Sequence, residues 1–335
     1  MPAQPDSQSP GFATASLARR RLAMIVWACT ITGLLAILQY LQPPNQSLAW
    51  IACLDAGHAP LFGAIGLAVL QFLLATPLVN RSRFYLYGLA LGITILMGAL
   101  SEWLQIGADR NSDLRDFARD VLGACAFLLA AATWDRRALF NPRFGRVVRA
   151  SCRGTALVLL ALAFSPGAVI AHAYVERAAA FPALLDFAGT WETNFVMANH
   201  ARLEYTSLPR ASGGAISTWH ITFEPARFSA FKLVEPYPDW AGYQHLRLVA
   251  QSELGRPIDL ILRIHDRQHD GRYLDRFNRS LTFLPGVNEF VIPLAEVRSA
   301  PEGREMDLSA IQRLSLFAVA PEEGFSLYLL ELGLD

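Results

Sequence analysis

The fold is decided by residues 84–106, FYLYGLALGITILMGALSEWLQI, an apolar run of membrane-spanning length that polar side chains interrupt near its end. A helix needs roughly 20 apolar residues to cross the hydrocarbon core of a bilayer, and this run has that length. Glu102 and Gln105 lie about one helical turn apart within it. Because charged groups are costly in a bilayer, such residues usually face one another or a water-filled cavity. The run therefore predicts a membrane helix that carries part of a functional site.

The composition of the whole chain is typical of a membrane protein. Of its 335 residues, 53% are hydrophobic and 17% are charged. Five apolar stretches are long enough to span a bilayer, and we expect them at residues 22–41, 58–79, 84–106, 117–134 and 155–174. The first follows Arg19, Arg20 and Arg21 but ends without a small-x-small cleavage motif, so we interpret it as an uncleaved anchor and not as a signal peptide.

The arginines predict how the chain is oriented, since loops on the cytoplasmic side carry the excess of Lys and Arg. Arg19 to Arg21 place the N-terminus in the cytoplasm, and six arginines between residues 135 and 154 place that loop there too, in contact with lipid and not with nucleic acid. Five crossings then put everything after about Val175 outside the cytoplasm. We expect a multi-pass protein of a bacterial inner membrane whose C-terminal domain is extracytoplasmic.

Three pairs of polar residues fall at the expected outer ends of the second, third and fourth spans. The members of each pair are three or four residues apart, so they lie on one face of a helix. The pairs are Asp55 with His58, Glu102 with Gln105, and Asp116 with Asp120. Arg110, in the loop between the third and fourth spans, is the natural cation for these carboxylates. We expect the seven side chains to form one polar pocket.

The same residues resemble the VanZ-like family of membrane proteins. That family has an Asp-Lys-x-x-His start to one span, then Glu-x-x-Gln, a loop Arg, an Asp six residues later and Asn-x-x-Gly. This chain reads Asp55-Ala-Gly-His58, Glu102-x-x-Gln105, Arg110, Asp116 and Asp120-x-x-Gly123. The resemblance covers about residues 19–134 and implies a four-helix membrane domain. Ala56 and Asp120 stand where the family has Lys and Asn, which implies a more acidic site that favours a cation or a protonated carboxyl.

The pocket has three interpretations, which the sequence leaves open. In an enzyme, His58 would act as general acid or base, oriented by Glu102 or Asp116, on a lipid-linked or peptidoglycan-related substrate. In a metal site, a divalent cation would bind His58, Glu102, Asp116 and Asp120, although a single His among carboxylates is no distinctive zinc spacing. A noncatalytic network would recognise an amphiphile head group or stabilise the bundle. No cofactor other than a divalent cation is expected.

From about Leu184 to Asp335 the sequence pattern changes to that of strands. Apolar and polar residues alternate with a period of two, as in Ile258-Asp-Leu-Ile-Leu-Arg-Ile264, between turns rich in Gly, Pro and Asp. This pattern predicts an all-β sandwich of two sheets. Several segments resemble jelly-roll domains of the galactose-binding-like, carbohydrate-binding type. They are Arg263-Ile-His-Asp-Arg-Gln-His269, Tyr273-Leu-Asp-Arg-Phe-Asn278, Leu284-Pro-Gly-Val-Asn288, Ile292-Pro-Leu294, Asp307-Leu-Ser309 and Leu314-Ser-Leu-Phe317.

The resemblance to carbohydrate-binding domains implies a glycan surface built from aromatic rings, which stack on sugar faces when they are exposed. The candidates are Trp219, Tyr237, Trp240, Tyr243 and Tyr273, each of which also fits a place in the core. A second cluster gathers His265, Asp266, His269, Asp270 and Asp275 between residues 265 and 276. It fits either a metal site or an ordinary polar loop, because Asp and Gly also favour turns.

The predicted organisation is a multi-pass α-helical membrane bundle followed by an all-β jelly roll. Its parts are a disordered tail at 1–18, four VanZ-like helices at 19–134, a basic loop at 135–154, a fifth tethering helix at 155–175 and the sandwich at 184–335. The predicted function is the handling of a surface glycan or its lipid-linked precursor. The alternatives are a membrane-embedded hydrolase or transferase, and a scaffold whose sandwich binds a protein.

Overall fold

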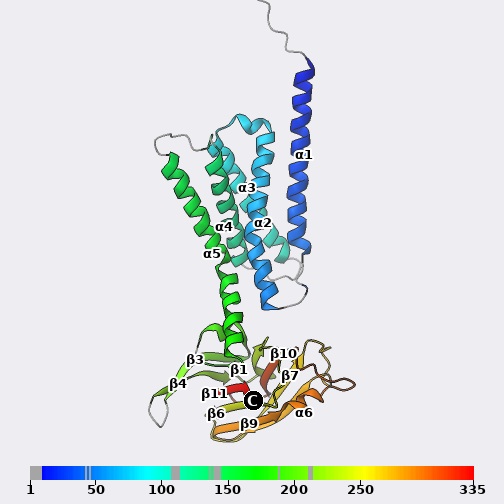
Figure 1. The fold of residues 1–335 in the computed structure, drawn as a ribbon, viewed down its shortest axis with the longest axis vertical. Helices are drawn as coiled ribbons and strands as arrows, with labels where there is room; N and C mark the ends of the chain where they lie inside the picture. Colours follow the sequence, from blue (N-terminus) through cyan, green and yellow to red (C-terminus); the bar gives the residue numbers. More distant parts are fainter. Residues whose placement is uncertain are drawn as a thin grey trace, which may run out of the picture. The chain divides into compact units, whose positions relative to one another are not determined.

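The computed structural model describes residues 10–41, 44, 47–106, 114–135, 137–138, 145–187, 189–209 and 214–335, without the side chains of 10–16 and 104–106. The chain divides into two compact units, Met1–Ile170 and Ala171–Asp335. The first is helical and the second contains two antiparallel sheets (Figure 1). The predicted order, a helical region followed by a β sandwich, is therefore confirmed.

The helical unit is built from long apolar helices. They are α1 (Pro10–Tyr40), α2 (Leu48–Ala75), α3 (Arg83–Ile106), α4 (Leu114–Trp134) and most of α5 (Gly145–Ala180), with a short 3-10 turn, η1 (Pro77–Asn80), between α2 and α3. All five α-helices are long and apolar enough to cross a membrane, judged by length and composition. Helix α2 begins well before the predicted span because the Ser47 side chain accepts a hydrogen bond from the Trp50 amide and caps it.

Helix α2 is the centre of the helical unit and contacts α1, α3 and α4 (Figure 1). Its side chains Phe62 and Ile65 are completely buried, together with Leu86 of α3. On α1 and α5, by contrast, large apolar side chains such as Leu22 and Leu157 are 63% and 67% exposed. The outer helices thus present apolar surface that no described residue of the chain covers.

Two glycines allow α2 and α4 to approach closely. A Cβ atom at Gly123 of α4 would lie 2.0 Å from the backbone oxygen of Ala59, and a Cβ at Gly63 of α2 would lie 2.4 Å from the Phe127 ring. Small residues at a helix crossing permit such contact between backbones. Because His58 precedes Ala59 and Asp120 lies one turn before Gly123, this crossing also sets the distance between His58 and Asp120.

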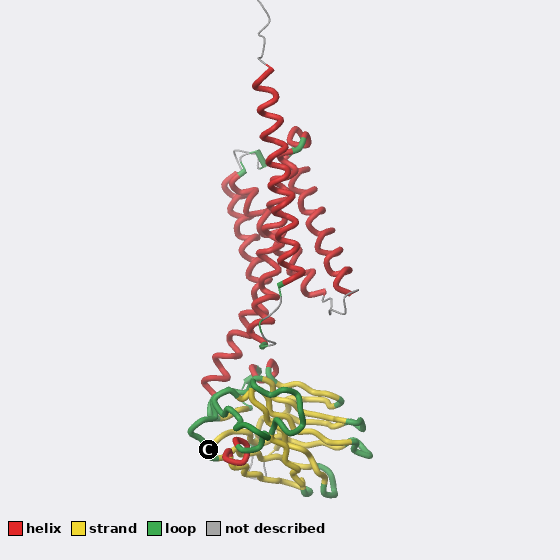
Figure 2. The backbone as a smooth tube through the Cα atoms, turned by 90° about the vertical axis from the view of Figure 1, so that its right-hand side faces the viewer, coloured by secondary structure: helices red, strands yellow, loops and turns green. Residues whose placement is uncertain are grey.

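The sandwich consists of two antiparallel sheets. One has the order β3-β4-β11-β6-β9, with β1 also paired to β11, and the other has the order β2-β5-β10-β7-β8. Figure 2 shows these strands with loops at their ends. The strands are β1 (Ala183–Leu185), β2 (Val196–Asn199), β3 (Ala201–Pro209), β4 (Ala215–Phe223), β5 (Phe228–Val234), β6 (His245–Ser252), β7 (Ile258–Asp266), β8 (Phe277–Phe283), β9 (Gly286–Pro293), β10 (Ile311–Val319) and β11 (Phe325–Leu334). Two short helical segments, η2 (Trp191–Asn194) and α6 (Leu294–Arg298), complete the unit.

The last turns of α5 belong to the sandwich unit and are attached to it by polar contacts. The Tyr174 hydroxyl donates a hydrogen bond to the Glu235 carboxylate, and the Arg177 guanidinium donates to the Glu235 backbone oxygen at 2.5 Å. The Arg177 guanidinium also lies 5.1 Å from the centre of the Phe195 ring. The end of α5 is therefore held in one orientation on the β5 side of the sandwich.

The close crossing of α2 and α4 leads to a test by Gly123→Ala. We expect the added methyl group to destabilise the helical unit by about 1–3 kcal/mol, because the backbone of Ala59 cannot move aside without shifting α2. The measurement is thermal unfolding of the full chain in detergent. Gly88→Ala on α3 is the matched control: nothing lies within 4 Å of its Cβ position, so it should be neutral or stabilising by up to about 1 kcal/mol. Equal melting temperatures for both variants would contradict the close crossing.

Candidate functional site

A buried pair of side chains joins α2 to α4 in the helical unit. His58 Nδ1 lies 2.9 Å from Asp120 Oδ1. The Asp120 side chain is only 3% exposed, and its second oxygen, Oδ2, is buried with no hydrogen-bond partner among the described residues. Gly98 of α3 leaves room beside that oxygen, since a Cβ there would lie 3.4 Å from it. The pair can therefore pass a proton between an imidazole and a carboxylate and still offer one free oxygen.

Arg119 supplies the cation of the same region. Its Nη1 lies 3.2 Å from Asp55 Oδ2 of α2 and also contacts the Asp116 carboxylate on its own helix. Arg110 was the cation predicted for this role, and Arg119 was not among the predicted residues. The missed signal was the spacing of Arg119 three residues after Asp116, which puts both on one face of α4. Arg110 and the side chain of Gln105 lie outside the described residues.

The helices α2, α3 and α4 together contribute six polar groups, which we call the polar cluster. They are Asp55, His58, Glu102, Asp116, Arg119 and Asp120, and the charge of Glu102 on α3 acts on His58. Carboxylates outnumber basic groups in the cluster. Among the described residues, however, the one group of three or more ligand atoms within 4.8 Å of one another lies elsewhere. The predicted metal site of His58, Glu102, Asp116 and Asp120 is therefore not assembled in this structure.

That group of ligand atoms belongs to His269, Asp270 and Asp275, in the polar loop after β7. Its oxygens and nitrogens already have partners within the protein. Asp275 Oδ1 accepts a hydrogen bond from Arg304 at 2.5 Å, and its Oδ2 accepts one from the Asp270 amide at 2.8 Å. His269 Nδ1 lies 2.7 Å from the backbone oxygen of Asp275. The contacts favour the interpretation of this segment as an ordinary polar loop.

Arg304, in the segment between α6 and β10, holds that loop from outside it. It donates to both oxygens of Asp266, at 2.6 and 2.9 Å, and the Asp266 carboxylate is completely buried. Burial alone would raise the pKa of Asp266, but the hydrogen bonds from Arg304 and from the Asp307 amide lower it below its usual value. The neighbouring His265 is buried next to His269 and Arg313, and burial in particular lowers the pKa of His265 to about 4.

The five aromatic candidates for glycan binding differ in how far their rings are exposed to solvent. Trp219 is 4% exposed and Trp240 is fully buried, and both indole nitrogens donate to partners at 2.7 Å, in Glu192 and in the Tyr237 backbone. The prediction that these two stack on sugars was wrong, because both rings belong to the core. Tyr237 and Tyr243 are half-buried and pack against one phenylalanine, Phe181.

Tyr273 is the candidate that remains accessible. Its side chain is 62% exposed and lines a cavity of about 490 Å³ together with Arg272, Leu274, Asp275, Glu302 and Gly303. The Arg276 guanidinium lies 5.2 Å from the centre of the Tyr273 ring. An exposed ring, an arginine and a glutamate therefore converge at one open cavity.

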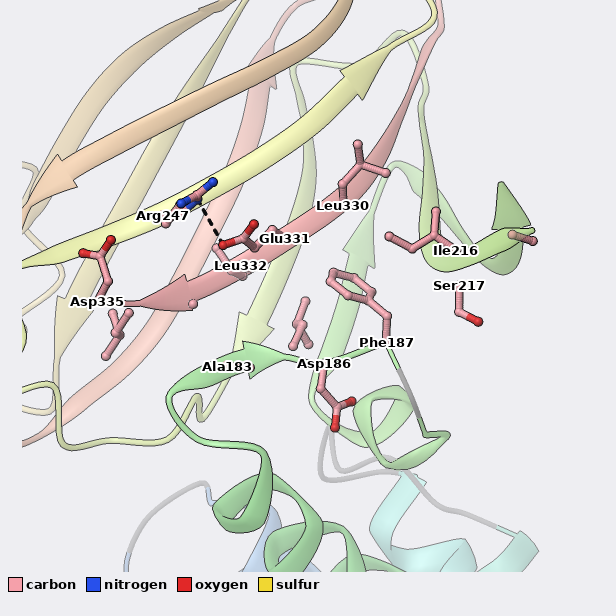
Figure 3. Close-up of a pocket in the computed structure, with 14 residues that line it drawn as sticks. Ala183, Asp186, Phe187, Ile216, Ser217, Arg247, Leu330, Glu331, Leu332 and Asp335 are labelled. Atoms are coloured by element: carbon pink, nitrogen blue, oxygen red, sulfur yellow. Dashed lines mark ion pairs between the residues drawn. The ribbon is translucent and has the colours of Figure 1, made fainter. Parts of the chain in front are cut away.

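A second cavity, of about 620 Å³, lies between β1, the start of β4 and the end of β11 (Figure 3). Arg247 of β6 and Glu331 of the adjacent β11 line it as an ion pair (Figure 3), with Arg247 Nε 3.1 Å from Glu331 Oε1. Its one aromatic lining residue, Phe187, is 8% exposed. The cavity thus offers charged groups but no open ring on which a sugar could stack.

No protein-family model and no curated protein matches this sequence, so the resemblance to VanZ-like proteins has no independent support. Solved structures match part of the chain. A family 11 carbohydrate-binding module from Clostridium thermocellum, in complex with a β-1,3-1,4-mixed-linked tetrasaccharide, matches 45% of this chain and 93% of its own, with 14% identity and a TM-score of 0.36. A family 30 carbohydrate-binding module of a cellulosomal cellulase from the same organism matches 42% of this chain and 90% of its own, with 12% identity and a TM-score of 0.31.

An exo-β-agarase structure matches 42% of this chain but only 23% of its own, with 12% identity and a TM-score of 0.34. This chain therefore spans less than a quarter of that enzyme. With identities below 25% and TM-scores below 0.5, these likenesses assign no ligand and no reaction to the chain.

Arg304 gives a test of the polar loop. Arg304→Gln leaves the Asp266 carboxylate buried without its cation, so we expect the sandwich to lose about 3 kcal/mol of unfolding free energy at pH 7. Hydrogen exchange of the β7 and β10 amides at increasing denaturant measures this loss. Arg256→Gln is the control, because its exposed pair with Glu323 should contribute less than about 1 kcal/mol.

The loss of unfolding free energy in Arg304→Gln should also depend on pH. In the wild type the folded-state pKa of Asp266 lies below its unfolded value, so its contribution is present above about pH 4 and is lost as the pH falls through the folded pKa. Without Arg304 the buried carboxyl is more stable when it is protonated. The stability difference between wild type and Arg304→Gln should therefore shrink as the pH falls, first above about pH 4, where the variant's buried carboxyl takes up its proton, and then below about pH 4, where the wild type loses its contribution. A constant difference would contradict this role of the pair.

Proposed function

We propose that this chain is an integral membrane protein of the bacterial cell envelope and that its sandwich recognises a glycan, either on the cell surface or on a lipid-linked precursor. The observation that carries the proposal is the open Tyr273 ring at a cavity of about 490 Å³. That volume lies in the ordinary range of small-ligand sites. An exposed tyrosine offers its face to the C–H groups of a sugar ring, and Arg272 and Glu302 beside it can hydrogen-bond to hydroxyl groups.

The placement in a membrane rests on the helical unit. Five helices have spanning length and apolar composition, and the exposed leucines of α1 and α5 would be covered by lipid. Arginines cluster at residues 19–21, before the apolar part of α1, and between residues 136 and 153, up to the first turns of α5. Under the positive-inside rule this pattern puts the N-terminus in the cytoplasm and the sandwich on the opposite side of the inner membrane.

The glycan proposal is tested with Tyr273→Ala. We expect the affinity of the full chain for its glycan to fall about tenfold, equal to about 1.4 kcal/mol, because the stacking surface is lost. The measurement is binding of a fluorescent glycan panel to spheroplasts that express the chain, with glycans too large to cross the membrane. Val291→Ala is the control, since Val291 is also an exposed apolar residue but lies on β9 of the other sheet, away from the cavity.

The outcomes of this experiment separate the possibilities. Binding by wild type and Val291→Ala that is about tenfold weaker in Tyr273→Ala supports both the glycan site and its extracytoplasmic position. Glycan binding that appears only after lysis would place the sandwich in the cytoplasm. If no glycan binds and a protein is captured instead, the sandwich is an interaction scaffold and the glycan proposal fails.

The polar cluster favours a second candidate function, a membrane-embedded hydrolase or transferase. The specific observation is the buried pair of His58 with Asp120, which has a free carboxylate oxygen. His58 would act as general base or acid, Asp120 would hold its imidazole in one orientation, and the charge of Glu102 would stabilise the protonated ring. Arg119 keeps Asp55 and Asp116 paired with a cation.

The second candidate is tested by complementation of a strain that lacks the gene and shows an envelope defect. His58→Ala and Glu102→Gln should each fail to restore growth although their membrane levels match the wild type, since the proton-transfer group or its supporting charge is lost. His172→Ala is the control, because His172 is exposed on α5 and lies beside Glu176 of the same helix. Full complementation by His58→Ala and Glu102→Gln would remove catalysis from consideration.

A further inference from the structure

Four cations gather on one face of the sheet β2-β5-β10-β7-β8. We call them the basic strip: Lys232 on β5, Arg313 on β10, Arg263 on β7 and Arg276 just before β8. Ser315 is the register partner of both Lys232 and Arg263, so these two side chains share one face of the sheet. Arg313, two residues from Ser315, shares that face because side chains alternate along a strand.

The face that carries the strip points away from the core. Arg263 lies between Leu262 and Ile264, which are both completely buried. Alternation therefore directs Arg263 to the outer side of the sheet. Lys232 is likewise next to the buried Phe231 and Leu233. The strip is thus an outward surface of the sandwich, formed by adjacent strands that are far apart in sequence.

The four cations lack carboxylate partners. None of the ion pairs formed by the described residues includes a member of the strip, and Arg276 Nε is buried without a hydrogen-bond partner among those residues. The opposite sheet is different: Arg202 pairs with Glu224 at 2.9 Å and Arg247 pairs with Glu289 at 3.1 Å. Unpaired positive charge is therefore concentrated on one of the two sheets.

The strip is electrostatically unfavourable as it stands. Burial lowers the pKa of Lys232, and the charges of Arg313 and Arg263 lower it further. Burial and the charge of Arg276 lower the pKa of Arg263. An anion on this face would relieve the repulsion between the cations, so the free energy of the strip falls when such a ligand binds.

Aromatic rings hold two of the guanidinium groups in place. Arg263 lies 4.4 Å from the centre of the Phe317 ring, and Arg276 lies 5.2 Å from that of Tyr273. A stacked guanidinium keeps its N–H groups at the edge of its plane, where a carboxylate or sulfate can bind two of them at once. The contact of Arg276 with Tyr273 also makes the strip continuous with the proposed sugar-stacking ring.

From these observations we infer that the ligand of the sandwich is an acidic glycan, whose carboxylate or sulfate groups bind the basic strip while one of its sugar rings stacks on Tyr273. The inference rests on the proposed glycan recognition and adds the charge and path of the ligand. From β2 to β8 the sheet spans four inter-strand steps, or about 19 Å, which accommodates a short oligosaccharide that runs across the strands.

Two other polyanions fit this surface less well. Nucleic-acid-binding domains usually have a pI above about 9, whereas this chain has no formal net charge and a pI near 7.1. An anionic bilayer is usually bound by basic side chains that project from a helix or a segment next to the membrane. Here Lys232 and Arg263 are half-buried on a sheet face, and Arg263 is stacked against Phe317.

The first experiment compares an acidic glycan with a neutral one. The full chain in nanodiscs of zwitterionic lipid is titrated calorimetrically with oligogalacturonate and, separately, with a neutral galactose oligosaccharide of the same length. We expect only the acidic sugar to bind, with an affinity that falls when salt is raised from about 0.05 to about 0.5 M. Arg263→Gln and Lys232→Gln should each weaken binding at least about tenfold, since each removes a charged contact. Lys232→Arg keeps the charge and should retain most of the affinity.

Arg202→Gln is the control, because Arg202 is an exposed arginine of the opposite sheet that is already paired with Glu224. A second measurement requires no substitution. Lys232 is the single lysine of the chain, so reductive methylation with a ¹³C label marks only Lys232 and the N-terminal amine while it preserves the charge. The pKa of the labelled Lys232 should rise when the acidic sugar binds and stay unchanged with the neutral sugar. The charged groups that face it are Arg313 and Arg263.

The possible results distinguish an error in the acidic charge of the ligand from an error in glycan recognition itself. Equal, salt-independent binding of neutral and acidic sugars overturns the acidic ligand but leaves glycan recognition intact. The absence of binding by any sugar overturns both. If vesicles with anionic lipid, or a DNA duplex, displace the acidic sugar and lose affinity in the same Arg263→Gln and Lys232→Gln variants, the strip belongs to that polyanion and the glycan assignment is wrong.

Discussion

The contact between the backbones of α2 and α4 is the constraint on which the helical unit depends. Gly123 has no Cβ atom, so its chain can approach Ala59 at a distance that any other residue would forbid. That approach brings His58 of one helix to within 2.9 Å of Asp120 on the other. The close packing of α2 on α4 and the contact between His58 and Asp120 therefore both depend on Gly123. A larger residue at position 123 would separate the two side chains as well as the helices.

The polar cluster and the sandwich contain different kinds of unmatched charge. In the polar cluster carboxylates outnumber basic groups, and Arg119 is shared between Asp55 and Asp116. In the sandwich, Arg304 pairs with the buried Asp266 at the end of β7, while the cations of the basic strip form no ion pair with the residues that the structure describes. Buried charges that lack partners are expensive unless a ligand supplies the missing group. Both the free oxygen of Asp120 and the basic strip are therefore places where binding would lower the free energy.

Sequence patterns were sufficient for the order of the elements and for part of the site. The apolar runs located five helices, and the alternation around Ile258 located strands. Spacing of three or four residues correctly put Asp55 with His58, and Asp116 with Asp120, on single helix faces. Arg119 was not predicted as a cation of the site, because it becomes the partner of Asp55 only when α2 and α4 cross; Arg110, the predicted cation, lies outside the described residues. The choice of sugar-binding aromatics failed for Trp219 and Trp240, since composition does not distinguish a core ring from an exposed one.

Periodicity along the chain is a local property, so the sequence alone established helices, strands and the faces on which their polar residues lie. Which faces meet depends on contacts between distant segments, and those appeared only in the folded chain. The burial of Trp219, the exposure of Tyr273 and the placement of Arg304 against Asp266 all follow from such contacts. The basic strip is the clearest case. Its cations come from separate strands, and the sheet register, not their spacing in the sequence, makes them neighbours.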